Sequence, residues 1–525
     1  MSTPKRNLTG AAAIVMSSIV VSRITGFFRE MLIPNVLGAR EADAYVMAFK
    51  ITDLMYNMLV GGAIAAALIP VLAGYIEKRD EEEGWKAVGT FINVVFLSMA
   101  GVCLLGMIFA RKLVPFIAMG FQGEATELTI RLTRILFPSV SFIMLAGLVN
   151  GVLNSYHRFA ASAYGPTLYN IGGALSLLFL NRYGVEAVAV GVMCSSLLYF
   201  LFQLTFAMKN LKFYRFRIYL HHPGFRRLFK LAIPSLASSS IVQVNVIVSA
   251  MFVTLFGLGS VNAFNMADRT WQMPYGIFAQ GIGIAMLPTL SAKLAMGDLD
   301  DYRDILMKGL KTVLFLSIPS AVGFVVLKDS LIRGIFQWTG SFNKDLVPIA
   351  GSILMFFSIA MLTQSIVAIM NRAFYAGNDT KTPLYVGAST ILVNLVLSYS
   401  FYRFTDLGVS GMALSYSITS ALNALLLLGL LNRKFKGIHL DKLMLFLLKV
   451  LPASAIMGIF LCFSNAVLNS GTGSKLLQLA VLGAEILAGA FLYFLVLALL
   501  KLDEALNILN IAAQRLKKLS AGIVK

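Results

Sequence analysis

The sequence is short of charge. Only 13% of its 525 residues are charged and 58% are hydrophobic, with a mean hydropathy of +0.79. Soluble globular chains carry about 25% charged residues, so this balance excludes a soluble globular protein. Apolar runs of about 20 residues, the length that crosses a hydrocarbon core, recur without a long polar segment between them. We therefore expect an all-α integral membrane protein without a soluble catalytic domain.

Residues that hold metals or act as nucleophiles are also scarce. The three cysteines, Cys103, Cys194 and Cys462, lie in apolar runs without metal-ligand spacing, so we expect ordinary buried thiols. The four histidines fall in short links, and no nucleophile is paired with a base. The sequence thus predicts a protein that is not an enzyme, with no catalytic residues, no metal site and no cofactor.

Hydrophobic runs predict about fourteen membrane spans. They are expected at residues 8–34, 42–76, 86–110, 126–154, 161–181, 184–208, 226–256, 261–293, 303–327, 346–376, 384–404, 408–432, 442–466 and 475–500. An even number places both termini on one side of the membrane. Lys and Arg are in excess in the links on that side, which predicts that both termini are cytoplasmic.

The chain also repeats itself. IAAALIPVLAGYIEKRDEEEGW at 64–85 resembles GIAMLPTLSAKLAMGDLDDY at 283–302, and the segment around Pro166 aligns loosely with the segment around Pro383. Because six spans separate the copies, both halves have the same orientation, as in transporters built from parallel repeats. The predicted domains are an N-terminal six-helix lobe at 1–208, a basic cytoplasmic linker at 209–225, a C-terminal six-helix lobe at 226–432, two additional transmembrane helices at 433–500 and an amphipathic cytoplasmic tail at 501–525.

The densest positive cluster is KNLKFYRFRIYLHHPGFRRLFK at 209–230, which contains no Asp or Glu. The net charge of +19 could suggest nucleic acid, but in a membrane protein the placement of the charges relative to the spans matters more. We interpret this cluster as a topology anchor against anionic lipid rather than as a specific ligand site. The tail at 502–520 has apolar residues at helical spacing and is expected to form an interfacial helix.

Charged side chains inside the spans are the main functional signal. Arg23 and Arg29 flank Gly26 in span one, within VSRITGFFRE, and Arg269 lies in span eight. A charge at mid-membrane costs on the order of 2.5–3.5 kcal/mol, so it persists where it faces a partner or a water-filled path. A bend at Gly26 would turn both guanidiniums of span one toward one cavity. Guanidinium grips phosphate oxygens with paired donors, so we expect these three arginines to bind a phosphorylated headgroup.

Other polar residues of the spans have two interpretations. They are candidates for gating or supporting roles, and they are also candidates for ion pairs that join helices, such as Arg29 with Glu30 or Lys50 with Asp53. For Lys50 with Asp53 we favour the ion pair, and for Tyr56 helix packing is the commoner outcome. The set comprises Glu30, Asp43, Lys50, Asp53, Tyr56 and Asp268.

These segments carry a family resemblance that covers nearly the whole chain. SRITGFFRE, DAYVMAFK, ALIPVLAGY, ADRTWQMPYG, AMLPTLS and FYAGNDTKTP resemble motifs of the MurJ/MviN lipid II flippases, in the superfamily that also holds multidrug and polysaccharide exporters. The resemblance implies two six-helix lobes, a central cationic cavity, and two extra C-terminal helices that form a groove for an undecaprenyl chain. It implies that Arg23, Arg29 and Arg269 contact the diphosphate and that Asp43 is the family's span-two aspartate.

The expected function is therefore movement of lipid-linked peptidoglycan precursor, lipid II, from the inner to the outer leaflet of the bacterial cytoplasmic membrane by alternating access. One segment departs from the family: where better-known members carry arginine and an acidic residue before GA, this chain reads MYNMLVGGA, with Tyr56, Asn57 and Gly61. The alternative is a flippase or exporter for another undecaprenyl-diphosphate-linked saccharide. The expected partners are the precursor and membrane lipids, with no nucleic acid; a monomer is favoured, and a coupling ion is left open.

Overall fold

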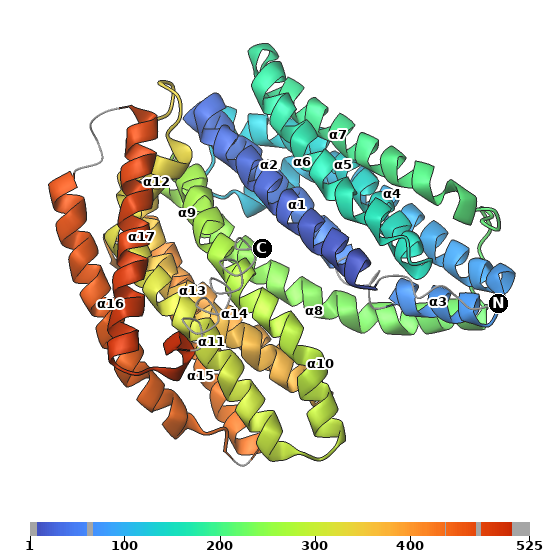
Figure 1. Ribbon diagram of the computed structural model, residues 1–525. Helices are drawn as coiled ribbons and strands as arrows, with labels where there is room; N and C mark the ends of the chain where they lie inside the picture. Colours follow the sequence, from blue (N-terminus) through green and yellow to red (C-terminus); the bar gives the residue numbers. More distant parts are fainter. Residues whose placement is uncertain (1–7, 60–66, 436, 469–473, 507–525) are drawn as a thin grey trace, which may run out of the picture. The chain divides into compact units, whose positions relative to one another are not determined.

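The computed structural model describes residues 8–59, 67–435, 437–468 and 474–506, which form helices joined by short turns, with no β-strand in these ranges (Figure 1). The predicted all-α fold class is confirmed. Helices are expected here because a helix satisfies its backbone hydrogen bonds internally, which an apolar surrounding demands. The chain divides into two compact units, one of residues up to Asn265 with Thr339–Asn343, the other of Met266–Trp338 with residues from Lys344 onward.

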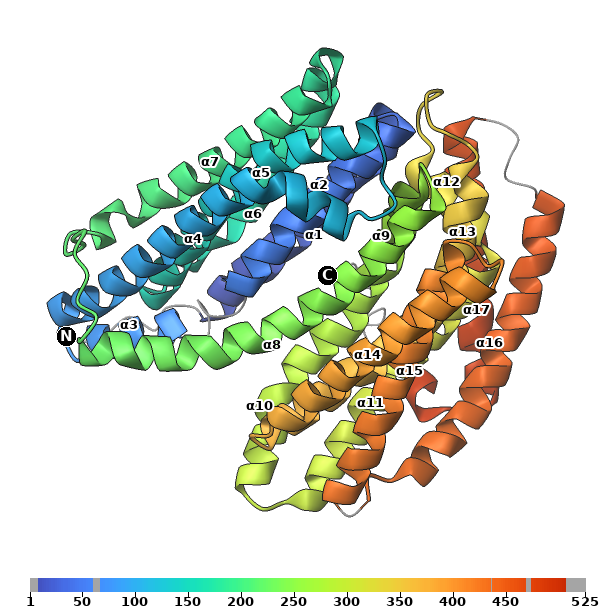
Figure 2. The ribbon, with the colours of Figure 1, turned by 180° about the vertical axis from the view of Figure 1, so that it is seen from behind.

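The first unit is a bundle of long helices. Within it α1 packs on α6, α4 on α5, α5 on α7, and α6 on α7. These contacts join segments far apart in the sequence, and both views show the helices running alongside one another (Figure 2). Its helices are α1 (Leu8–Val36), α2 (Ala39–Leu59), α3 (Ile69–Glu77), α4 (Glu81–Ile117), α5 (Glu124–Ser155), α6 (Phe159–Leu180), α7 (Val185–Ala207) and α8 (Pro223–Val253).

Four helices of the second unit repeat contacts seen in the first. Its α11 packs on α13, α13 on α15, and α14 on α15, the same order of neighbours as α4, α5, α6 and α7 in the first unit. These four spans therefore have equivalent partners in the two units. The helix α9 (Ser260–Tyr275) contains the boundary between the units, and the remaining helices are α10 (Gly281–Ala295), α11 (Leu299–Val326), α12 (Lys328–Phe336), α13 (Leu346–Ala376), α14 (Lys381–Phe404), α15 (Ser410–Lys434), α16 (Leu440–Leu468) and α17 (Lys475–Leu499).

Ten helices of the described ranges are long and apolar enough to cross a membrane. They coincide with ten of the predicted spans. The other four predicted spans are occupied by α1, by α2 with α3, by α6 and by α8, which lie outside that set of ten. The count of about fourteen stays a prediction. The short helix α12 was not predicted, because its nine residues mix charged and apolar side chains and are too few for a span.

The two additional C-terminal helices pack on the second unit. Helix α16 contacts α11, and α17 contacts α12 and α16. Glu485 of α17 is buried and accepts a hydrogen bond of 3.0 Å from the Ser464 hydroxyl of α16, so it faces the neighbouring helix. Gly489 allows the close approach of these helices, since a Cβ there would lie 3.0 Å from the Leu461 side chain. Residues 507–525 of the predicted amphipathic tail lie outside the described part of the structure.

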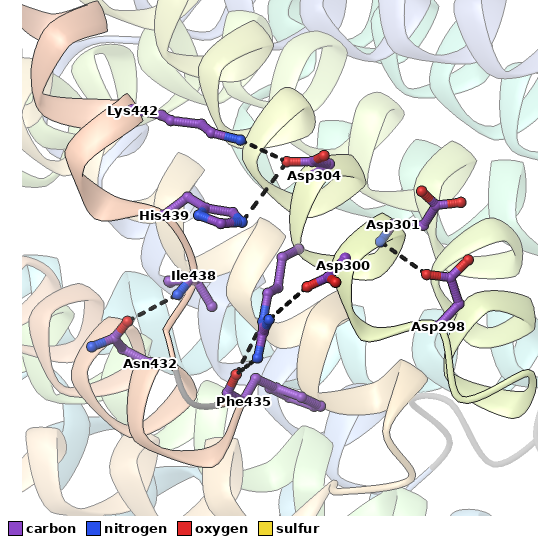
Figure 3. Close-up of polar contacts among 10 residues, drawn as sticks. Asp298, Asp300, Asp301, Asp304, Asn432, Phe435, Ile438, His439 and Lys442 are labelled. Carbon is purple, nitrogen blue, oxygen red and sulfur yellow. Dashed lines mark hydrogen bonds and ion pairs between the residues drawn. The ribbon is translucent and has the colours of Figure 1, made fainter.

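Polar side chains join the start of α11 to the link between α15 and α16 (Figure 3). The Arg303 guanidinium donates two hydrogen bonds to the Phe435 carbonyl, at 3.1 and 2.6 Å, and one of 2.8 Å to Asp300. Lys442 of α16 donates to Asp304 at 3.0 Å. Arg303 thus satisfies a carbonyl at the C-terminal end of α15, where a cation is also favoured by the helix dipole.

The cysteine prediction is wrong for two of the three residues. Cys103 is buried and its thiol lies 3.3 Å from the Phe137 carbonyl, whereas Cys194 and Cys462 are exposed on the helix surface. An apolar run predicts burial away from water, but the outer face of a membrane helix meets that condition against lipid without any protein contact.

Candidate functional site

Helix α1 is continuous through Gly26, which serves close packing against α6. A Cβ at Gly26 would lie 3.1 Å from the Asn170 side-chain nitrogen, and that nitrogen donates a hydrogen bond of 3.1 Å to the Ser22 carbonyl. On the two sides of this contact the predicted arginines have different surroundings: Arg23 is exposed, whereas the Arg29 side chain is only 13% exposed. The structure does not bury the two guanidiniums together.

The Arg29 guanidinium lies among aromatic rings. Its central carbon is 5.6 Å from the centre of the Phe49 ring of α2 and 5.4 Å from that of the Tyr169 ring of α6. Such contacts attract a cation through the negative faces of the rings. Its Nη2 donates a hydrogen bond of 3.0 Å to Glu30, the next residue along the helix. The nitrogens Nε and Nη1 are buried without a hydrogen-bond partner among the described residues.

A glycine makes room for this side chain. A Cβ at Gly173 of α6 would lie 2.9 Å from Arg29 Cδ, closer than real Cβ contacts come. The absence of a side chain at Gly173 therefore lets the Arg29 stem pass along α6. The Arg29 guanidinium therefore fits beside α6, and its Nε and Nη1 can still donate hydrogen bonds.

Glu30 joins α1 to the first turns of α9. Its Oε1 accepts from Arg29 and its Oε2 accepts a hydrogen bond of 2.9 Å from the Asn265 side chain. The carboxylate is buried and both of its oxygens accept hydrogen bonds, so it fixes the positions of the Arg29 and Asn265 side chains relative to each other. Arg29 and Glu30 do form an ion pair, but as consecutive residues of α1 rather than as the predicted pair between helices.

Asp43 of α2 is fully buried and caps the N-terminus of α9. Its Oδ2 accepts a hydrogen bond of 2.6 Å from the Gly259 backbone nitrogen, and its Oδ1 accepts one of 2.7 Å from the Asn262 backbone nitrogen. A carboxylate at this place satisfies backbone donors that the helix itself leaves open and complements the helix dipole. The geometry gives Asp43 a positioning role for α9.

The other candidates of α2 are more loosely placed. The Lys50 ammonium lies 5.3 Å from the centre of the Phe264 ring, Asp53 is exposed, and Tyr56 is half-buried. Two departures from the family pattern cannot be compared: the side chain of Asn57 and the whole of Gly61 lie outside the described part of the structure.

In the second unit, Asp268 and Arg269 lie on α9. The Asp268 carboxylate accepts a hydrogen bond of 3.0 Å from the Trp271 ring nitrogen, which orients that ring. Trp271 is buried and packs against Phe357, with ring centres 5.8 Å apart, and against Tyr416, with ring centres 6.3 Å apart. Arg269 is half-buried.

Sequence reasoning missed the residues that surround Arg29. Tyr169 and Gly173 are far from Arg29 in the chain, and no spacing rule connects positions on different spans. Phe49 lies within the quoted motif DAYVMAFK, which was a signal for it, whereas Asn265 lies two residues before the motif ADRTWQMPYG. Among the residues that the structure describes, no cluster of His, Cys, Asp or Glu is arranged to hold a metal ion.

Comparison with known proteins identifies similar sequences over most of the chain. The family described as "Lipid II flippase MurJ" matches residues 33–481. The lipid II flippase MurJ of Burkholderia cenocepacia is 29% identical over 503 residues, which cover 93% of this chain and 96% of that protein. The probable lipid II flippase MurJ of Rhizobium tropici is 30% identical over 497 residues, which cover 90% of this chain and 91% of that protein.

Solved structures share the fold. A lipid II flippase MurJ in an inward closed conformation superposes with a TM-score of 0.76 at 24% identity, covering 93% of this chain and 98% of that one. An inward-facing multidrug resistance transporter of the MATE family, in the MOP superfamily, superposes with a TM-score of 0.68 at 16% identity. The superposition covers 81% of this chain and 98% of the transporter chain. This chain thus shares the fold of these two transporters.

Proposed function

This chain belongs to the MurJ family of lipid II flippases, a family of membrane transporters rather than enzymes, and from that membership we propose that it moves lipid II from the inner to the outer leaflet of the cytoplasmic membrane. The observation that carries the proposal is the match of the family over residues 33–481, together with relatives of that name that align over nearly their full length. The chain is a multi-pass bacterial membrane protein.

Arg29 is proposed as a contact of the substrate diphosphate. Its buried Nε and Nη1 have no hydrogen-bond partner among the described residues, and these are the donors that a phosphate oxygen accepts from. Arg23 and Arg269 complete the proposed set of substrate-binding arginines. The exposed position of Arg23 suits a first contact with an arriving headgroup, because an exposed guanidinium stays hydrated until it is paired.

Glu30 is proposed to hold Arg29 when no substrate is bound. A diphosphate and the Glu30 carboxylate compete for the same guanidinium, so substrate binding weakens the contact from Arg29 to Glu30 and, through it, the contact to Asn265. Asp43 supports α9 at its N-terminus, Asp268 orients Trp271, and Lys50, Asp53 and Tyr56 are supporting residues of α2. The transport cycle is proposed to follow alternating access, by a monomer with both termini cytoplasmic.

The test is the exposure of lipid II on the outer leaflet of bacteria whose only candidate flippase is this protein. Arg29→Ala is expected to abolish exposure at a membrane level equal to wild type, whereas Arg29→Lys keeps part of it if charge alone matters. Arg182→Ala, at an exposed arginine outside the proposed set, is the matched control and should transport normally.

Two outcomes contradict parts of the proposal. Full exposure in the Ala variants of Arg23, Arg29 and Arg269 would overturn the arginine site while leaving the transported lipid in place. Absence of exposure with correctly inserted wild type would overturn lipid II as the substrate and make another undecaprenyl-diphosphate-linked saccharide the next one to measure.

A further inference from the structure

The segment 209–230 follows the end of α7 and runs into the first two turns of α8, and it presents a surface with positive charges only, called here the linker surface. Every Lys and Arg in it is exposed, and it contains no Asp or Glu. Glu83 of α4, an acid that contacts this segment, is engaged with His222 at 2.8 Å and with Lys86 at 2.9 Å. The arginines of the linker surface therefore keep their charge available for a partner outside the protein.

Large apolar side chains stand exposed between these cations. Phe216 is 64% exposed, Leu220 54% and Phe229 48%, and Ile218 is exposed as well. Apolar groups gathered on a surface mark a contact with another apolar phase or molecule. Basic residues interleaved with Phe, Leu and Ile are the composition of segments that lie in a membrane interface, with the apolar groups at the acyl boundary and the cations on lipid phosphates.

Hydrogen bonds to the backbone hold the linker surface on α4. The Asn93 side chain donates to the carbonyls of Arg215 and Arg217, at 3.3 and 2.9 Å, and accepts from the Tyr214 hydroxyl at 2.7 Å. The Tyr219 backbone nitrogen donates to the Thr90 hydroxyl at 3.0 Å. Because these bonds use main-chain atoms of the arginines, their backbone is already ordered while their side chains remain exposed, and only the side chains must be ordered when a ligand binds.

The linker surface directly follows a helix of span length, so we expect it at the level of the lipid headgroups. It begins at the end of α7, one of the ten helices suited to crossing a membrane, and it includes the first turns of α8, which begins at Pro223. Cations within a few residues of span ends act on the headgroup layer, where each is worth about 1 kcal/mol against an anionic surface.

We propose that the linker surface is a binding site for anionic phospholipid headgroups of the inner leaflet. Arg215 and Arg217 contact lipid phosphates, while Phe216, Ile218 and Leu220 insert at the acyl boundary. Binding there fixes the first unit to the membrane surface through α4. This site is separate from the arginines proposed for transport, and it does not depend on which lipid the protein moves.

The experiment uses the full-length protein in detergent, titrated with phosphatidylglycerol or with phosphatidylcholine and followed by native mass spectrometry. The variant Arg215→Gln/Arg217→Gln removes two side-chain charges and keeps the backbone bonds to Asn93. We expect its phosphatidylglycerol affinity to fall by about fivefold for each charge removed, with phosphatidylcholine binding unchanged. Added salt should weaken the wild-type affinity and have less effect on the variant.

A matched control removes two exposed cations elsewhere in the same unit. Lys112→Gln/Arg182→Gln has the same net charge as the linker variant, and Lys112 lies about 28 Å along α4 from Asn93. The control should keep wild-type affinity. Equal phosphatidylglycerol affinity in wild type and linker variant, or an equal loss in the control, would overturn the proposal.

A second variant tests the apolar part. Phe216→Ser/Ile218→Ser keeps every charge, so it should weaken the binding of both lipids by a similar factor. If it left both affinities at the wild-type value, insertion of these side chains would be refuted.

Discussion

At the scale of single residues, Arg29 combines features that a helix-joining arginine does not need. One donor group pairs with Glu30, two rings lie against the guanidinium, and two further donors are buried without a partner in the described part of the chain. A buried donor without a partner costs about 1–3 kcal/mol. We therefore propose that a ligand completes these bonds.

Gly173 offers a test of this environment without touching a charge. In Gly173→Ala the new methyl group would lie 2.9 Å from Arg29 Cδ and must displace the arginine stem. Since misplacing a binding group by about 1 Å can cost up to 100-fold in rate, we expect outer-leaflet lipid II exposure to fall by roughly tenfold or more. The measurement is the rate of lipid II exposure at matched membrane level.

The control for this prediction is Gly101→Ala in α4, where a Cβ would meet nothing within 4 Å. It carries the same chemical change in a helix of the same unit and should transport at the wild-type rate. Normal exposure in Gly173→Ala would show that the position of the Arg29 stem is irrelevant to transport.

At the scale of elements, side-chain caps fix where helices meet. Asp43 holds the N-terminus of α9, and Arg303 holds the C-terminal end of α15. Asp379 joins the beginning of α14 to the end of α15, because it accepts from the Thr382 backbone nitrogen at 3.0 Å and from Lys434 at 2.6 Å. These charged caps lie at helix ends, where backbone groups lack intrahelical partners.

Asp379 makes a pH-dependent contribution to stability. Burial alone would raise the pKa of its carboxyl, but the hydrogen bonds from Lys434 and Thr382 outweigh it and lower the pKa to about 2. Because the pKa is lower in the folded state, the ionised carboxylate stabilises the fold at every pH above the unfolded-state pKa near 3.8. This stabilisation is lost as the pH falls through the folded-state pKa of about 2. We expect Asp379→Asn to lower the free energy of unfolding by about 1 kcal/mol at pH 7, a value reduced for solvent screening of an exposed pair.

The measurement is thermal unfolding of the purified protein in detergent at pH 7 and at steps between pH 4 and pH 2. The difference between wild type and Asp379→Asn should be largest at pH 7 and shrink across the acid steps. Asp406→Asn, at an exposed aspartate of the link after α14, serves as the control and should track wild type. A difference that grows toward low pH would contradict the assignment.

At the scale of the whole molecule, the prediction concerns topology. The spans predicted from the sequence place the segment 328–345 outside and the segment 209–225 inside. His221 and Ser341 are both exposed in the structure, which makes them suitable for labelling. In a background with Cys103, Cys194 and Cys462 replaced, we expect Ser341→Cys to react with a membrane-impermeant thiol reagent in intact cells. His221→Cys should react only after the membrane is permeabilised.

The reversed pattern would place both termini outside and would move the linker surface to the outer leaflet. Labelling of both cysteines in intact cells would point instead to leaky membranes, and a cytoplasmic marker protein, which must stay unlabelled, checks for this.

Much of the element pattern was predictable because a bilayer imposes it. Each predicted span overlaps a helix, since an apolar stretch in lipid has no other way to satisfy its backbone. Two features were not predictable from hydropathy. The helix α12 is too short to appear as a span, and exposed Cys194 and Cys462 cannot be told from buried Cys103 when both protein and lipid are apolar.

The candidate site was predictable only in its charged members. Arg23, Arg29, Arg269 and Asp43 stand out in the sequence because charge inside a span is expensive. The different environments of Arg23 and Arg29 could not be predicted from the sequence. A straight helix places the two side chains about 120° apart, but packing against α2 and α6 decides that Arg23 is exposed and Arg29 is mostly buried.

The sequence by itself determined that this chain is a helical membrane protein and which few residues carry charge where lipid would exclude it. These properties follow from composition and period, which are local. Only the tertiary structure decided that Gly173 leaves room for the Arg29 side chain and that Asn265 and Arg29 both donate to Glu30. It also decided that the Asn93 side chain binds backbone carbonyls of the linker surface. Contacts of this kind join residues more than 100 positions apart, and they depend on which helix faces pack together, a choice that no sequence window contains.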